Sequence, residues 1–118
     1  NTAKEIYKVA EELNMTTIIE THTDSEAKKA LDYKNAIIGI NNRNLKTLKT
    51  DIKTTYDLYK VLAKHSGPLV CESGIKSEKE VEEIVKKTKI NNFLIGESLL
   101  KDLDQNSSLL KRILQITK

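Results

Sequence analysis

The stretch that decides the fold is Ile37-Ile38-Gly39-Ile40-Asn41-Asn42-Arg43-Asn44-Leu45. Its β-branched apolar run stops abruptly in three amides and a guanidinium. Apolar runs of this length between polar residues are typical of strands buried on both faces of a parallel sheet. Ligands bind at the C-terminal ends of such strands in parallel α/β proteins. The stretch therefore predicts a buried parallel strand that presents Asn41 and Arg43 to a polar or anionic ligand.

Strands and helices are expected to alternate on both sides of this stretch. Segments rich in β-branched or apolar residues predict three further strands, at 16–22, 69–74 and 93–96. Apolar residues at helical spacing predict helices at 2–13, with Asn14 as the C-cap, and at 53–64 and 107–117. A further helix, capped by Thr23, Asp24 or Ser25, is expected to run through Leu31, and residues 97–100 are expected to form a short helix. A Ser77–Glu80 capping box predicts the start of a helix that carries Val81, Ile84 and Val85. The expected architecture is α/β: a leading helix and four strand–helix units, with one parallel four-strand sheet. We expect a single domain over residues 1–118.

Composition and charge exclude several classes of protein. Of the residues, 31% are charged and 38% hydrophobic, so a folded, soluble domain is expected. The net charge of +3 is dispersed along the helices, which argues against a nucleic-acid partner. No apolar run approaches membrane-spanning length, so no membrane partner is expected. The single cysteine, Cys71, fits a reducing, cytoplasmic location. Because the chain begins at Asn1 and not at Met, we expect that an upstream segment is missing.

Side chains alternate across a strand, so the polar strand ends can be assigned to a face. If Glu20 and Asn41 point to the inner face of the sheet, Glu72 and Leu94 do so as well. The predicted rim carries the following polar residues: Glu20, Asn41, Arg43, Glu72 and Ser73. Two carboxylates near an amide and a guanidinium can move protons and hold a charged substrate.

Glycines end the last two predicted strands, as Ser73-Gly74 and as Gly96-Glu97. A glycine lets the backbone approach a ligand and donate N–H groups to it. A short helix that begins near Gly96 adds its positive N-terminal end. This pattern predicts a phosphate site.

Four segments in this order and spacing, IIETH, IIGINNRNL, VCESGI and FLIGESLL, resemble the second half of indole-3-glycerol phosphate synthase. The resemblance covers essentially all of the chain. It implies strands five to eight of a TIM (β/α)8 barrel, so that the fold is a (βα)4 half-barrel. It also implies a carboxy-lyase of tryptophan biosynthesis, which converts a carboxyphenylamino-deoxyribulose phosphate into indole-glycerol phosphate, carbon dioxide and water.

The resemblance also assigns roles to individual residues. It makes Glu20 the acid/base carboxylate and Asn41 an active-site amide. It places Arg43, Glu72 and Leu94 against the substrate, and Ser73, Gly74, Gly96 and Glu97 at its phosphate. For Glu97 we expect a role of the backbone N–H, with the side chain turned away from the phosphate because like charges repel.

One departure from the family limits the expected activity. The catalytic lysines of the family lie on strands that this chain lacks, and no lysine here falls on an inward strand position. We therefore expect the chain alone to be inactive as an enzyme. A relic half-barrel that binds phosphate or self-associates without catalysis is the alternative. A different phosphate-binding barrel, such as phosphoribosylanthranilate isomerase or a histidine-pathway isomerase, fits the NNRNL segment less well.

Expected partners follow from the half-barrel. A half-barrel exposes two strand edges and an apolar inner face, which favours association. We expect either a homodimer or higher oligomer, or a complex with a missing N-terminal half. The expected ligand is a sugar phosphate, or free phosphate or sulfate. We expect no cofactor, and no metal because two distant histidines and one cysteine do not make a metal site.

Each candidate residue also has a purely structural interpretation. Glutamates at strand ends are usually solvated, and Asn41 and Asn44 could be turn formers. Gly74 could serve a helix-initiating turn, and Gly96 could be a packing glycine.

Overall fold

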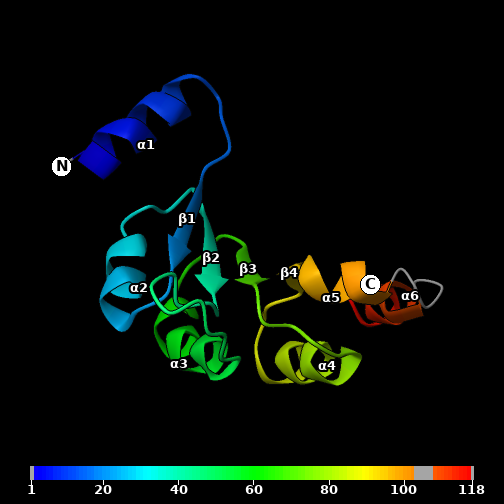
Figure 1. Ribbon diagram of the computed structural model, residues 1–118. Helices are drawn as coiled ribbons and strands as arrows, with labels where there is room; N and C mark the ends of the chain where they lie inside the picture. The colour runs from blue at the N-terminus through cyan, green and yellow to red at the C-terminus, as the bar shows by residue number, and fades with distance from the viewer. Residues whose placement is uncertain (1, 103–107, 118) are drawn as a thin grey trace.

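The computed structural model describes residues 2–102 and 108–117, and within them four strands form one sheet. The strands are β1 (Ile18–Thr21), β2 (Ile37–Asn41), β3 (Leu69–Glu72) and β4 (Asn92–Leu94). Neighbouring strands are parallel and follow the chain in the order β1-β2-β3-β4 (Figure 1). The predicted four-strand parallel sheet is confirmed, with strands a few residues shorter than expected.

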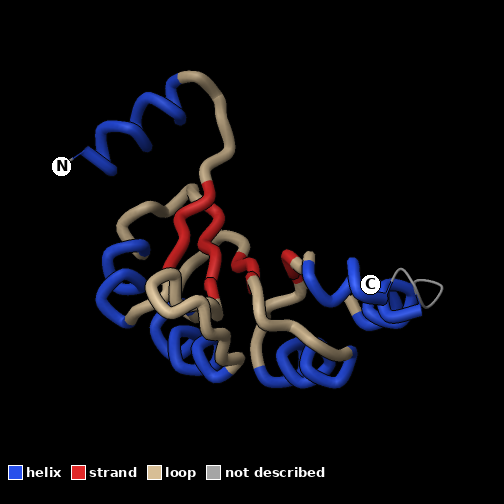
Figure 2. Tube along the Cα trace, viewed as in Figure 1, coloured by secondary structure: helices blue, strands red, loops and turns tan. Residues whose placement is uncertain are grey.

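Helices alternate with these strands, as Figure 2 shows. They are α1 (Thr2–Glu12), α2 (Asp24–Ala30), α3 (Lys53–Leu62), α4 (Glu78–Lys87), α5 (Glu97–Asp102) and α6 (Ser108–Ile116). The predicted first residue of the last helix, Ser107, lies outside the described residues. Thr23 caps α2 through a complete capping box with Glu26, and the Ser77 hydroxyl accepts the Glu80 N–H at the start of α4. The chain therefore consists of a leading helix followed by four strand–helix units, and this order confirms the predicted half-barrel.

The hydrophobic core lies between one face of the sheet and the helices that follow the strands. Ile38, Ile40 and Cys71 are fully buried on this face. The helices contribute Ala27, Ala30, Leu58, Leu62, Val81 and Ile84. On the opposite, inner face, Ile18 and Leu94 are 53% and 61% exposed. The alternation predicted from the sequence therefore holds, and the inner face with its strand ends is open.

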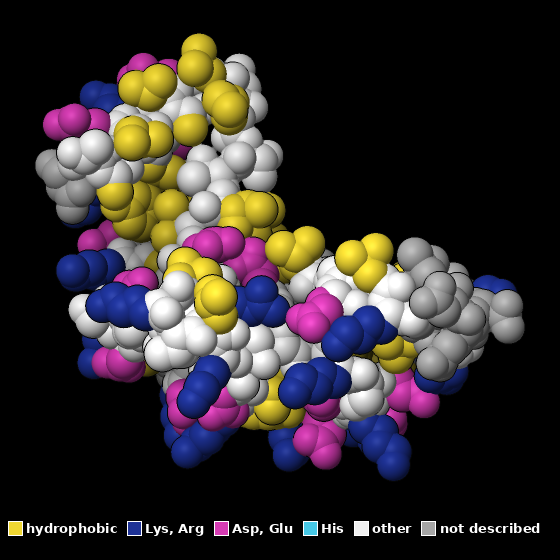
Figure 3. Space-filling model, viewed as in Figure 1, with side chains coloured by type: hydrophobic (Ala, Val, Ile, Leu, Met, Phe, Trp, Pro, Cys, Tyr) yellow, Lys and Arg dark blue, Asp and Glu magenta, His cyan; other side chains and the backbone are white. Residues whose placement is uncertain are grey.

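Helix α1 stands away from the rest of the chain (Figure 1). None of its residues is buried, and a hydrogen bond from Asn35 Nδ2 to Glu11 Oε1 at 3.0 Å is among its few tertiary contacts. The radius of gyration is 15.1 Å, whereas a compact chain of this length has about 13.5 Å. The apolar side chains Ile6, Val9, Leu13 and Met15 are more than half exposed. Figure 3 shows hydrophobic side chains gathered over this helix.

Candidate functional site

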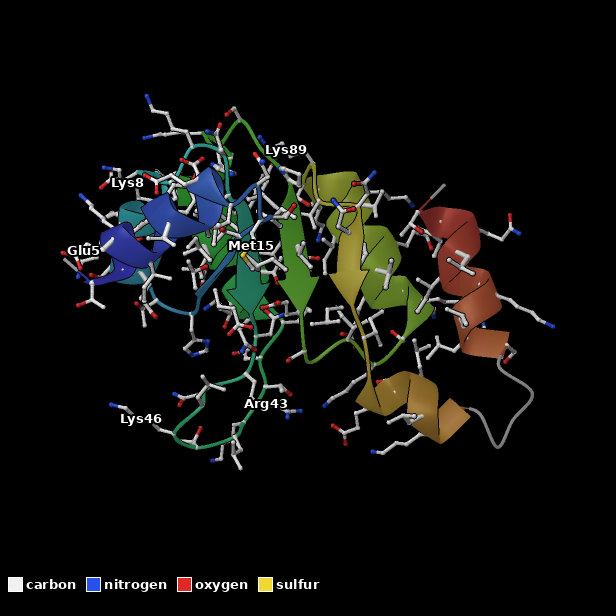
Figure 4. All side chains as sticks on the ribbon, turned by 90° about the horizontal axis from the view of Figure 1, so that it is seen from above. Glu5, Lys8, Met15, Arg43, Lys46 and Lys89 are labelled. Atoms are coloured by element: carbon white, nitrogen blue, oxygen red, sulfur yellow. The ribbon has the colours of Figure 1, made fainter. Side chains whose placement is uncertain are left out.

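The predicted inner-face residues lie side by side at the C-terminal ends of the strands. The strand register pairs Asn41 with Glu72 and Glu72 with Leu94, so these three form one row across β2, β3 and β4. Glu20 lies on β1 opposite Gly39, one inner-face row earlier. Figure 4 shows Arg43 in the loop at the arrowhead ends of the strands, with Lys89 at the other end. The fold thus brings side chains from four βα units to one edge.

The two carboxylates of this edge have different environments. Glu20 is exposed, whereas Glu72 is only 4% exposed and its Oε2 has no hydrogen-bond partner among the described residues. Burial, together with the nearby Glu20 carboxylate, raises the pKa of Glu72 to about 7. At neutral pH Glu72 is therefore partly protonated. A buried carboxyl group that gains and loses a proton near neutral pH, with a second carboxyl group nearby, is suited to acid–base chemistry.

The raised pKa makes the stability of the fold depend on pH. Between about pH 4.5 and about pH 7 the folded chain holds a proton on Glu72 that the unfolded chain releases. The stabilisation is full below this window and is lost as the pH rises through it, by up to about 3 kcal/mol. We expect Glu72→Gln to flatten this dependence, measured as the urea midpoint at about pH 5 and about pH 8. Glu82→Gln, on the exposed face of α4, is the control. An unchanged pH dependence in Glu72→Gln would contradict the assignment.

Asn41 is 9% exposed and fixes the chain just after β2. Its Oδ1 accepts the Arg43 N–H at 2.9 Å, and its carbonyl oxygen lies 2.7 Å from His22 Nδ1. The first contact is an Asx turn, the local hydrogen bond that makes asparagine frequent at bends. Asn41 therefore forms a turn, as its purely structural interpretation expects, and it also lies in the inner-face row.

Arg43 directs its guanidinium toward the start of α5. Its Nη2 lies 3.4 Å from Glu97 Oε2, and Glu97 Oε1 lies 3.2 Å from Lys101 Nζ. The hydrogen bond and charge of Lys101, and then Arg43, lower the pKa of the Glu97 carboxyl. The Glu97 side chain is therefore an anion between two cations at this edge.

A cavity of about 840 Å³ opens beside these residues, between the ends of β3 and β4 and helices α4, α5 and α6. Its lining includes Ser73, Gly74, Leu94, Gly96 and Glu97 from the predicted site, together with Arg43. Further charged lining residues are Lys76, Lys79, Lys101, Arg112 and Glu78. Positive side chains therefore outnumber negative ones, and the size suits a small phosphorylated molecule.

The two glycine turns of the cavity are held together. Ser73 and Gly74 both have left-handed backbones, with φ of 63° and 72°, which explains a glycine at the second position. A side chain added at Gly96 would meet no atom within 4 Å, so the backbone there is open to a ligand. Ser98 Oγ donates to the Ile75 carbonyl oxygen at 2.5 Å, which ties the start of α5 to the segment after Gly74.

Asn42 is a residue that the sequence did not single out, and it organises the interior of this edge. It is fully buried. Its Nδ2 donates to the carbonyl oxygens of Glu72 and Ser73 at 3.2 and 3.0 Å, and its Oδ1 accepts from Thr55 Oγ1 at 2.7 Å. The side chain thus joins the end of β2 to the turn after β3 and to the first turn of α3. The sequence feature that could have pointed to Asn42 is its position as a second amide directly after Asn41.

The remaining histidine and the cysteine have structural contacts. His65 is buried, with Nε2 2.8 Å from the Ala36 carbonyl oxygen, and burial raises the pKa of the Cys71 thiol. No group of three acidic, histidine or cysteine side chains suited to a metal ion occurs among the described residues. Within the same residues, no helix has the length and apolar character needed to cross a membrane.

Comparisons with known proteins point to one family. The profile described as "Indole-3-glycerol phosphate synthase" matches residues 1–112. The chain is 38% identical over 109 residues to the indole-3-glycerol phosphate synthase of Polynucleobacter asymbioticus, covering 92% of this chain and 40% of the relative. It is 41% identical over 99 residues to that of Aquifex aeolicus, covering 83% and 38%. The "Tryptophan biosynthesis protein TrpCF" of Helicobacter pylori J99 is 38% identical over 110 residues, covering 93% and 24%.

The chain therefore spans two fifths or less of the length of these relatives. A solved structure from Aquifex aeolicus VF5, described as "Structural study of Project ID", superposes with a TM-score of 0.58. It covers 98% of this chain and 44% of that one, at 14% identity, and so supports the fold alone.

Proposed function

The chain belongs to the indole-3-glycerol phosphate synthase family, and from this premise we propose that it is the C-terminal half of such a synthase. The reaction closes a ring on a carboxyphenylamino-deoxyribulose phosphate and releases carbon dioxide and water. The observation that carries the proposal is the position of the Glu20–Glu72 carboxyl pair and Asn41 at the same strand ends as the positively lined cavity. A proton-transfer centre and an anion site side by side are what a phosphorylated substrate requires.

Each part of the edge then has a task. The phosphate binds in the cavity beside the Ser73–Gly74 turn and Gly96, where the backbone is accessible. The exposed Leu94 side chain, next to Glu72 in the register, packs against the aromatic ring of the substrate. Glu20 moves protons during the loss of water. Arg43 turns from Glu97 to the substrate when the ligand carries its own negative charges.

The other half of the active site must come from elsewhere. None of the lysines in the described residues lies in a strand, so the inner face has no ammonium group to serve as an acid. We propose that an N-terminal half supplies it and covers the inner face and the open edge of β1. The exposed apolar side of α1 favours the same association. Self-association of a relic half-barrel, which would bury the same surfaces, is the second candidate.

Binding to the chain alone tests the proposed half-site. We expect indole-3-glycerol phosphate and inorganic phosphate each to shift the backbone amide signals of residues 73–74 and 96–97 in NMR titrations. The indole compound should also shift those of Asn41 and Leu94. Arg43→Ala should weaken binding of both because a cation of the cavity is lost. Lys46→Ala is the matched control, because this substitution also removes one positive charge from the loop. The Lys46 side chain extends to the side of the loop opposite Arg43 (Figure 4).

The outcomes separate the candidates. Shifts with phosphate only, and none with the indole compound, would favour the relic half-barrel. Absence of shifts at residues 73–74 and 96–97 with either ligand would contradict the phosphate site.

A further inference from the structure

Gly39 lies at the centre of the inner face, on β2 and opposite Glu20 of β1. A Cβ atom built at this position would lie 2.8 Å from Glu72 Oε2 and 2.9 Å from its Cδ. Real Cβ atoms essentially never make contacts this short, so the carboxyl group occupies the space that a side chain at position 39 would fill. Gly39 itself is buried beneath it.

The register shows how the Glu72 side chain reaches this place. The α-carbon of Glu72 pairs with Asn41, whereas Gly39 pairs with Val70, one inner-face row earlier. The side chain therefore folds back across β2, toward the row that holds Glu20. If the Glu72 side chain did not turn back in this way, its carboxyl group would project from the strand end into the open edge and would be solvated like that of Glu20.

The backbone conformation gives no other reason for glycine at this position. Among the glycines, Gly74 is the one with positive φ, so β2 at Gly39 has an ordinary extended backbone that alanine also adopts. All three atoms nearest to the added Cβ belong to the end of the Glu72 side chain. An alanine would therefore displace that flexible carboxyl group and leave the strand in place.

We propose that Gly39 is a positioning residue, which leaves room for the Glu72 carboxyl group over β2 and so holds this group buried on the inner face, toward the row that holds Glu20. This inference rests on the proposed function of the carboxyl pair. Glu20 is the charged group that acts on Glu72 from β1. The inner-face neighbours of Glu72 on the other strands, Asn41 and Leu94, are uncharged. The pKa of Glu72 is therefore set by the burial that Gly39 permits and by the Glu20 carboxylate.

The test is the titration of Glu72, followed by carboxyl ¹³C NMR, in the unmodified chain and in Gly39→Ala. We expect the pKa of Glu72 to fall from about 7 toward its usual value of 4.5 in the variant, a shift of at least about one unit. Gly96→Ala is the matched control because its added methyl group meets nothing within 4 Å. It should leave the titration of Glu72 unchanged. An unchanged Glu72 titration in Gly39→Ala would overturn the proposal.

A second variant keeps the proposal testable if Gly39→Ala does not fold. Glu72→Asp shortens the side chain by one methylene, so its carboxyl group no longer reaches over Gly39 to Glu20. We expect the new aspartate to titrate close to the usual value of that residue type, and a strongly raised pKa would overturn the proposal. Neither titration depends on turnover. If the chain mixed with an N-terminal half proves inactive, this result would refute the proposed function without deciding the role of Gly39.

Discussion

Replacing Asn42 by alanine will destabilise the chain by about 3–5 kcal/mol, a large part of the stability of a domain of this size. The side chain is fully buried and satisfies groups on three elements. Its removal takes the Asn42 Nδ2 donor from the Ser73 carbonyl oxygen. The Glu72 carbonyl oxygen, the Thr55 N–H and the Thr55 hydroxyl each lose one hydrogen bond and keep a second, to the Asn42 N–H, the Ile52 carbonyl oxygen and Cys71 Sγ. Each lost hydrogen bond contributes about 0.5–1.5 kcal/mol. Each buried group left without a partner costs about 1–3 kcal/mol. The free energy of unfolding in urea measures the effect.

Asn44→Ala is the matched control for this prediction. Asn44 belongs to the same polar run, but its Oδ1 accepts the N–H groups of Lys46 and Thr47 within one half-exposed loop. We expect a loss of about 1 kcal/mol for this variant. The account of Asn42 would be wrong if the two variants lost equal amounts of stability.

Loss of Asn42 should also loosen the phosphate side of the site. The side chain holds the carbonyl oxygen of Ser73, whose backbone and that of Gly74 have positive φ. In the NMR titrations, the shifts of residues 73–74 with phosphate should therefore shrink in folded Asn42→Ala under stabilising conditions.

The sequence predicted most of the fold because its strands obey simple rules. Ile38 and Ile40 face the helices, while Gly39 and Asn41 face inward, so the alternation of side chains predicted the two faces of β2 correctly. The ends of helices were also predictable where the residues have a local role: Asn14 follows α1 with a φ of 57°.

Two features of the site depend on tertiary contacts that no local pattern encodes. Asn42 and Asn41 are adjacent, buried amides, and only the packing of α3 and the turn after β3 makes Asn42 the one that joins three elements. The backward course of the Glu72 side chain depends on an empty position at Gly39 of the neighbouring strand. A sequence pattern read along one strand cannot show a contact of this kind.

The position of α1 was a third feature that periodicity could not reveal. Its apolar stripe predicted a helix correctly, and a stripe of this kind usually faces the core of a domain. Ile6 and Leu13 are each 64% exposed. An amphipathic helix without a packed face is the expected result when the surface that covers it belongs to another chain or segment.

The second large effect concerns catalysis. Alone, the chain should form no detectable indole-glycerol phosphate, because no lysine of its described residues lies in a strand. Supplied with the N-terminal half of a relative such as the Polynucleobacter asymbioticus synthase, it should gain turnover by at least about a hundredfold, since a positioned acid or base contributes about 10²–10⁴ in rate. In that complex, Glu20→Gln should remove about the same factor, while the exposed control Glu82→Gln should have no effect.

The most direct test of the half-site account is this assay, with indole-glycerol phosphate formation measured for the chain alone and for the chain with the N-terminal half. The account predicts no turnover alone, turnover in the mixture, and its loss with Glu20→Gln. Turnover by the chain alone, or a mixture in which Glu20→Gln is as active as the unmodified chain, would contradict it.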